Sequence, residues 1–123
     1  MICQRRPDDP HPGKWEFPGG KLQEGEDAAA CLWRELQEEL GIDATIGPEL
    51  HSATHTYPNG RTVALSFFHV PSFRGDLINT QFQALAWVEH EQLPTYDFLE
   101  GDLEFVAALA RGQWEHIFSS TSP

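Results

Sequence analysis

Basic residues, cysteine and long apolar runs are all scarce in this sequence. Its 123 residues include 8 Lys and Arg against 19 Asp and Glu, which gives a net charge of −11. Because a protein that grips nucleic acid along its backbone needs a basic surface, this balance argues against a nucleic-acid partner. A small polyanionic substrate is still compatible with the charge, since a bound metal ion inverts the local field.

Only two cysteines are present, Cys3 and Cys31, and their spacing matches no metal or disulfide motif. A reduced, cytoplasmic protein is therefore expected. No apolar stretch is long enough to span a membrane and no signal peptide is recognisable, so no membrane partner is expected. The chain is predicted to form a single domain over residues 1–118, followed by a frayed tail at residues 119–123.

A helix with a strongly acidic face is the most informative segment. Residues 28–40 contain no Gly, Pro or β-branched residue, which predicts a helix, and Gly41 follows where a left-handed cap would fall. Glu35, Glu38 and Glu39 stand at i, i+3 and i+4 and therefore share one face. Like charges so close repel one another, but oxygen ligands are what Mg²⁺ requires. The cluster therefore indicates either a solvated acidic face or a magnesium site.

The spacing of residues in and before this helix resembles the Nudix box. The matching residues are Gly20, Glu26, Arg34, Glu35, Leu36, Gln37, Glu38, Glu39, Leu40, Gly41 and Ile42. The preceding Trp-Glu-Phe-Pro-Gly-Gly-Lys of residues 15–21 resembles the MutT-like branch of that family. Members of the family hydrolyse a nucleoside diphosphate linked to another group, and the resemblance extends from Gln4 to about Ala110.

The resemblance implies an α/β (α+β) fold, namely a Nudix-type α/β/α sandwich with a mixed β-sheet between two helices. The residue pattern predicts a hairpin turn at Asn59-Gly60, a connector at residues 43–49 and a loop at residues 71–80. Strands are predicted at residues 1–6, 15–17, 50–57, 62–70 and 84–89.

The second helix and the first strand carry two further expectations. The helix is predicted at residues 97–111, with Asp97 as its N-cap. Nudix domains begin their first strand further upstream than the strand end seen at Ile2–Arg6, so this strand is expected to be truncated and to leave an unpaired sheet edge. Because such an edge pairs readily with another chain, a homodimer is a hypothesis.

The resemblance also implies roles for individual residues. Four residues would hold Mg²⁺, or Mn²⁺ as its substitute: Gly19 through its carbonyl, Glu35, Glu38 and Glu39. Arg34 would orient the carboxylates, and Glu26 would support them from outside the set of ligands. Glu39 or Glu38 would act as the base on the attacking water, and the sequence does not separate ligand from base among these acids.

The nucleotide site is implied by further positions of the MutT-like pattern: Arg6, Phe17, Gly20, Tyr57, Arg61, Gln81 and Asp97. Phe17 and Tyr57 would either pack on the face of a base or belong to the core. Arg6 and Arg61 would meet phosphate or ribose. Asp97 would either read the edge of the base or cap the second helix.

Two classes of function compete at this point. One is a Mg²⁺-dependent nucleoside triphosphate pyrophosphohydrolase that releases a nucleoside monophosphate and pyrophosphate, with 8-oxo-dGTP, (d)CTP or another nucleoside diphosphate derivative as substrate. The other is a catalytically weak Nudix module that only binds a nucleotide. The complete box favours the enzyme. Gln81 favours the module, because it stands where MutT-like proteins often carry a further glutamate and an amide cannot serve as a base.

Overall fold

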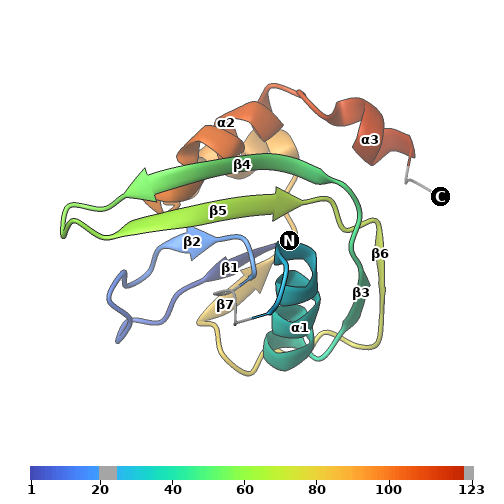
Figure 1. Ribbon diagram of the computed structural model, residues 1–123, viewed down its shortest axis with the longest axis horizontal. Coiled ribbons are helices and arrows are strands. Elements are labelled where there is room, and N and C mark those ends of the chain that lie inside the picture. The colour runs from blue at the N-terminus through green and yellow to red at the C-terminus, as the bar shows by residue number, and fades with distance from the viewer. Residues whose placement is uncertain (20–24, 121–123) are drawn as a thin grey trace.

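The computed structural model describes residues 1–19 and 25–120, which form short strands and helices in alternation (Figure 1). The strands are β1 (Ile2–Gln4), β2 (Trp15–Glu16), β3 (Asp43–Thr45), β4 (Glu49–Thr56), β5 (Thr62–Phe68), β6 (Ser72–Arg74) and β7 (Ala84–Ala86). The α-helices are α1 (Ala28–Leu40), α2 (Leu103–Ala110) and α3 (Glu115–Ser120), and the 3₁₀ helices are η1 (His90–Thr95) and η2 (Glu100–Asp102).

Helix α1 forms where the sequence predicts it, and both of its ends are capped. The side chain of Asp27 accepts a hydrogen bond from the Ala30 N–H at 2.7 Å. Gly41 ends the helix with a left-handed φ of 70°, and its N–H donates to the Gln37 carbonyl at 3.0 Å. Neither α1 nor another helix of the described ranges is long and apolar enough to cross a membrane.

Within the described ranges the strands form three separate antiparallel groups. β2, β1 and β7 form one sheet in that order, β3 pairs with β6, and β4 pairs with β5. The predicted unpaired edge on the first strand is therefore wrong, because β1 is paired on both sides. A parallel bridge between Trp15 and Phe98 joins β2 to the segment before α2, which makes the strand arrangement mixed.

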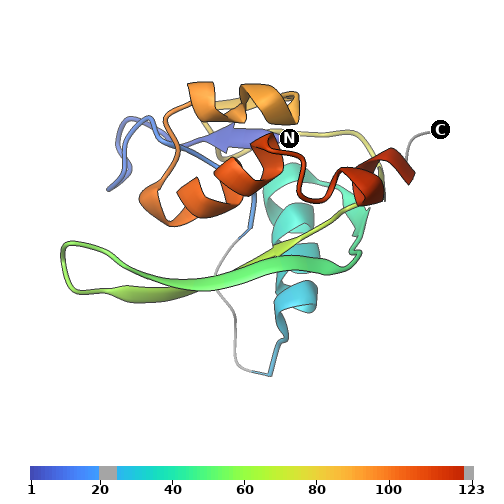
Figure 2. The ribbon, with the colours of Figure 1, turned by 90° about the horizontal axis from the view of Figure 1, so that it is seen from above.

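The hairpin of β4 and β5 also forms as predicted. Its turn contains Asn59 and Gly60, where Gly60 has a φ of 85° and donates its N–H to the Tyr57 carbonyl at 2.8 Å. The tip of the hairpin projects beyond the rest of the fold (Figures 1 and 2). Tyr57 and Arg61 therefore lie on the projecting end of this hairpin.

Two apolar clusters lie on opposite faces of β1. Ile2 belongs to the cluster that includes Phe67 of β5 and Phe105 of α2. Its neighbour Cys3 belongs to the cluster that includes Leu36 of α1. Because successive side chains of a strand point to opposite faces, α2 and α1 cover different sides of the strands. This is the α/β/α sandwich that the sequence predicts.

An apolar cavity of about 530 Å³ lies between these two clusters. Residues of both clusters line it, among them Phe67 and Leu36, so the two halves of the core do not close completely on each other. The cavity also reaches Trp87, whose side chain is 69% exposed.

Two predicted irregular segments contain strands instead. β3 lies within the predicted connector at 43–49 and β6 within the predicted loop at 71–80, so these predictions are wrong. Each strand has only three residues, which is too short for a period-two pattern to be recognised. Their pairing across the fold is supported by Arg74, whose Nη2 donates to Asp43 Oδ2 at 2.7 Å.

The second helix is shorter than predicted, and Asp97 is not its N-cap. α2 begins at Leu103, directly after η2. Asp97 lies in an extended stretch in which its carbonyl accepts from the Trp15 N–H at 2.9 Å, while the Leu99 N–H donates to the Trp15 carbonyl at 3.0 Å. Pairing with β2 thus overrides the local helix signal. The sequence did not predict η1 or α3, and α3 extends to Ser120.

Candidate active site

Arg34 gathers three of the predicted site acids around one guanidinium. Its Nε and Nη2 donate to the two oxygens of Glu26, at 2.6 and 3.1 Å. Its Nη1 donates to Glu35 at 2.9 Å and to Glu38 at 3.1 Å. Only a guanidinium offers enough donors in a fixed plane for this arrangement, so Arg34 holds the acids of α1 and of the preceding segment together.

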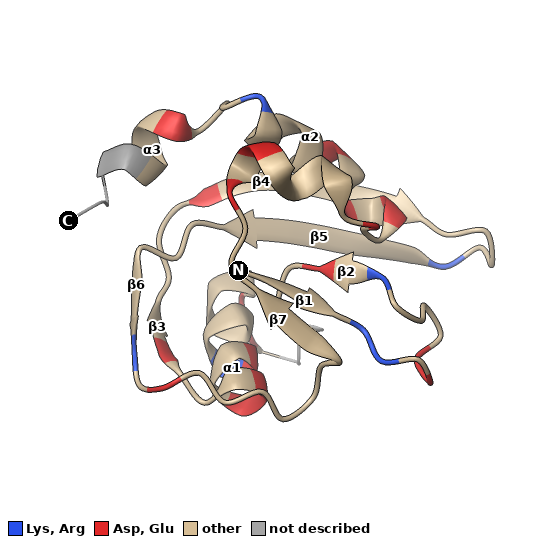
Figure 3. Cartoon of the chain, turned by 180° about the vertical axis from the view of Figure 1, so that it is seen from behind, with Lys and Arg blue, Asp and Glu red and all other residues tan. Residues whose placement is uncertain are grey.

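Glu39 differs from the other acids of α1 because it is buried, with 4% of its surface exposed. Burial raises its pKa to about 9, and a hydrogen bond to Glu35 and the charges of Glu35, Glu16 and Glu38 act in the same direction. The carboxyl of Glu39 therefore favours its protonated form near neutral pH. Figure 3 shows the acidic residues that α1 carries.

The chemistry of these donors fits a hard divalent cation. Several carboxylates lie close together, and the raised pKa of Glu39 reflects its burial among them, which a bound cation would offset. Within the described ranges, no three acidic, His or Cys side chains already surround a common point as ligands. The residues present can therefore supply the ligands, and the arrangement around a cation requires rearrangement of their side chains.

The glycines of the predicted site lie at the edge of the described chain. Gly19 lies against α1, because a Cβ at this position would lie 3.8 Å from Leu32 Cδ1. This places Gly19 beside the helix that carries the acids. Gly20, predicted to contact substrate, lies outside the described residues.

Phe17 packs within the aromatic core. Its ring centroid lies 5.3 Å from Phe98, 5.3 Å from Phe105 and 5.9 Å from Phe67. Of the two predicted roles of this side chain, the packing therefore favours core over stacking on a base.

Tyr57, the second aromatic residue of the predicted nucleotide site, is partly exposed. Its ring lies 4.6 Å from His55 and 5.3 Å from His11, so it remains a candidate for contact with a base.

The polar residues of the predicted nucleotide site are exposed and scattered. Arg6, Arg61 and Gln81 are exposed. Asp97 accepts a hydrogen bond from Lys14 Nζ at 2.8 Å and has 74% of its side chain exposed. Gln81 directly follows Thr80, whose hydroxyl donates to the Glu39 carbonyl at 3.1 Å, so it lies near the end of α1. The roles of these four residues in binding a nucleotide stay predictions.

Two acids that the sequence did not predict are the partly buried Glu16 and the buried Asp102. Burial raises the pKa of Glu16, although Arg5 opposes the shift. Burial and then the charge of Glu16 raise the pKa of Asp102 to about 7, against a hydrogen bond from the Phe17 N–H. Asp102 precedes α2 directly but makes no capping bond with its side chain. An acid directly before an apolar run is a sequence signal for the start of a helix. This signal fits Asp102, five residues after the predicted N-cap Asp97.

A comparison with family models matches the NUDIX domain over residues 1–109. The chain belongs to the Nudix family. With the box, the α/β/α fold and the relatives below, it is a MutT-like Nudix hydrolase.

Curated relatives of this Nudix hydrolase are named for nucleotide hydrolysis. It is 37% identical over 108 residues to a protein named CTP pyrophosphohydrolase from Escherichia coli K12, covering 88% of this chain and 79% of that one. It is 48% identical over 65 residues to 8-oxo-dGTP diphosphatase from Proteus vulgaris, covering 53% of this chain and 57% of that one. The chain thus belongs to a family of nucleoside triphosphate hydrolases.

Solved structures similar to this Nudix hydrolase agree with its fold. The solution structure of the E. coli ORF135 protein has a TM-score of 0.79 and 35% identity, covering 93% of this chain and 81% of that one. A MutT structure from a study of Aliivibrio salmonicida and Vibrio cholerae has a TM-score of 0.73 and 30% identity, covering 90% and 85%. The family assignment therefore holds for both sequence and fold.

Proposed function

We propose that this chain is a Mg²⁺-dependent pyrophosphohydrolase of nucleoside triphosphates, which releases a nucleoside monophosphate and pyrophosphate. The observation that carries the proposal is the carboxylate cluster of α1, in which Glu26, Glu35 and Glu38 bind Arg34 and Glu39 is buried beside them. A buried acid next to several others is unfavourable for a helix that serves stability alone, but the same carboxylates supply oxygen ligands for a divalent cation.

Each described acid then has a task in the reaction. Glu35, Glu38 and Glu39 would hold the cation, with the Gly19 carbonyl as a further ligand. When bound, the cation withdraws charge from the phosphates and acidifies a water. Glu39 or Glu38 would accept the proton of the attacking water. Arg34 holds Glu35 and Glu38 through hydrogen bonds of 2.9 and 3.1 Å, and Glu26 fixes Arg34 through bonds of 2.6 and 3.1 Å.

The substrate has two leading candidates, 8-oxo-dGTP and CTP with its deoxy or modified forms. The similarity to 8-oxo-dGTP diphosphatase supports the first, and the similarity to CTP pyrophosphohydrolase, over more of the chain, supports the second.

A panel of nucleotides incubated with Mg²⁺ and the purified protein tests the proposal. Products would be separated chromatographically, so that monophosphate plus pyrophosphate is distinguished from diphosphate plus phosphate. Turnover of 8-oxo-dGTP far above dGTP would support the first substrate, and turnover of CTP or dCTP above the purines the second. No hydrolysis of any member would overturn the proposal.

The remaining expectations are part of the same proposal. Mn²⁺ would substitute for Mg²⁺, because both accept carboxylate oxygens. A net charge of −11 supports a small-molecule substrate and no nucleic-acid partner. We also propose a cytoplasmic location. The homodimer has lost the unpaired edge of β1 as its ground and stays a hypothesis, which sedimentation over a range of protein concentrations tests.

A further inference from the structure

Arg5 connects three segments at the edge of the candidate active site. It directly follows β1, and its side chain contacts Asp9 in the next loop and Glu16 in β2. We propose that Arg5 is a positioning residue, which holds Glu16 beside the metal-binding acids and balances its charge. This inference rests on the proposed function for the identity of those acids.

The contacts of Arg5 use each of its three side-chain nitrogens. Nε donates to Asp9 Oδ1 at 2.7 Å, Nη2 donates to Asp9 Oδ2 at 3.0 Å, and Nη1 donates to Glu16 Oε2. The backbone adds a link, because the Arg5 N–H donates to the Lys14 carbonyl at 2.8 Å. A fork of this kind fixes the direction of the guanidinium, so Glu16 is held from one defined side.

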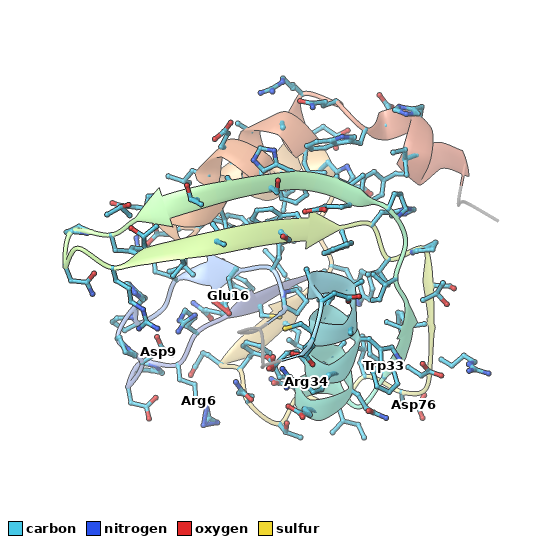
Figure 4. All side chains as sticks on the ribbon, viewed as in Figure 1. Arg6, Asp9, Glu16, Trp33, Arg34 and Asp76 are labelled. Atoms are coloured by element: carbon cyan, nitrogen blue, oxygen red, sulfur yellow. The ribbon has the colours of Figure 1, made fainter. Side chains whose placement is uncertain are left out.

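The position of Glu16 lets its charge affect the acids of the candidate active site. Glu16 pairs with Cys3 of β1, whose side chain packs with Leu36 of α1, and its charge raises the pKa of both Glu39 and Asp102. Figure 4 shows Glu16 between the loop that carries Asp9 and the helix that carries Arg34. Only 13% of the Glu16 side chain is exposed, so solvent screens this charge weakly.

Arg5 therefore balances the charge of Glu16 and also holds Glu16 in position. Two substitutions separate these two effects. Arg5→Gln removes the charge and leaves Glu16 without its ion pair. Arg5→Lys keeps the charge, but an ammonium cannot reach two carboxylates in the same planar arrangement. Glu16 also lies three residues before Gly19, so its position affects the backbone that leads into the site.

The test measures cation affinity without nucleotide and steady-state kinetics with it. In Arg5→Gln the unbalanced Glu16 should strengthen Mn²⁺ binding by about threefold to tenfold, while KM for the nucleotide rises and kcat stays within about twofold. If Arg5 only stabilised the local structure, Arg5→Gln would weaken the binding of Mn²⁺ as well as that of the nucleotide. In Arg5→Lys the Mn²⁺ affinity should stay near wild type while KM still rises.

A double-mutant cycle with Glu16→Gln shows whether the two residues act as a pair. Mn²⁺ affinity should return toward wild type in the double variant, because the unbalanced charge is gone. Arg74→Gln is the matched control, since it breaks an exposed pair with Asp43 outside the site and should change neither quantity.

Wild-type Mn²⁺ affinity in Arg5→Gln, or strictly additive effects in the cycle, would show that the inference is wrong. If Arg5→Gln fails to fold, the combination of unchanged Mn²⁺ affinity and raised KM in Arg5→Lys decides instead. Absence of turnover in the wild-type protein would overturn the proposed function, and the Mn²⁺ titrations would still test the pairing of Arg5 with Glu16.

Discussion

On α1, the buried carboxyl of Glu39 is hydrogen-bonded to Glu35, one helical turn earlier. Burial raises the pKa of Glu39 to about 9, and the charge of Glu35 acts in the same direction. Glu39 therefore favours its protonated form at the point where we propose that a cation binds.

Cation binding should release that proton. Because the pKa of Glu39 is raised to about 9, mainly by burial, Mg²⁺ must displace a proton at lower pH, and its affinity should rise with pH until Glu39 ionises. Titration calorimetry in two buffers of different ionisation enthalpy, at about pH 7, should give about one proton released per ion. A heat that does not depend on the buffer would contradict this assignment.

Glu39→Gln should abolish most of the activity while preserving the fold. An amide can neither replace the anionic ligand nor accept a proton, so kcat should fall by at least about 100-fold. Folding should not suffer, since the native carboxyl is already uncharged near neutral pH. Kinetics and thermal melting of Glu39→Gln, with exposed Glu104→Gln on α2 as a control, check both statements. Near-normal turnover in Glu39→Gln would rule Glu39 out as base or essential ligand.

Arg34→Lys should reduce activity through the carboxylates it no longer holds. A lysine cannot bind both oxygens of Glu26 and at the same time reach Glu35 and Glu38, although the charge is retained. We expect kcat/KM to fall by about 10- to 100-fold, as for other residues that orient metal ligands, with a higher Mg²⁺ requirement. Kinetics at several Mg²⁺ concentrations would measure it, and unchanged values would show that the charge alone suffices.

Asp102→Asn should change how stability depends on pH. The pKa of Asp102 is raised by burial from 3.8 to about 7, so the folded state binds its proton more tightly than the unfolded state. The free energy of unfolding should therefore decrease as pH rises from about 4 to about 7, by up to about 1.4 kcal/mol per pH unit from this group.

An asparagine keeps an acceptor for the Phe17 N–H and cannot ionise. Urea unfolding of both proteins across this pH range should show a flatter profile for Asp102→Asn and greater stability than wild type above pH 7. Parallel profiles would mean that Asp102 does not bind a proton over this range.

Local signals made helix α1 and the β4–β5 hairpin predictable from sequence. Gly41, at the end of the helix, and Gly60, in the hairpin turn, both adopt a positive φ. Asp27 caps the helix by accepting from the N–H of Ala30, three residues later. Arg34 could be placed among the acids for the same reason, since Glu35 and Glu38 lie within one turn of it.

Features that depend on contacts between distant segments were not predictable. β3 and β6 exist through pairing of Asp43 with Arg74, and the extended stretch at Asp97 exists through pairing with Trp15. The positions of Glu16 and Asp102 have the same origin, because Glu16 contacts Arg5 at the end of β1 and Asp102 accepts from the Phe17 N–H. Acidic residues are mostly exposed, so the sequence does not indicate which of them is buried. The environment of these two carboxyls is therefore known only from the structure.

The apolar cavity between the core clusters has a consequence for volume. Space that neither side chains nor ordered water fill efficiently is lost when a chain unfolds, so hydrostatic pressure favours the unfolded state. Of the cavity of about 530 Å³, which opens to the surface beside exposed Trp87, only the part closed to solvent adds to this effect. Larger apolar side chains built into that space would make it resist compression.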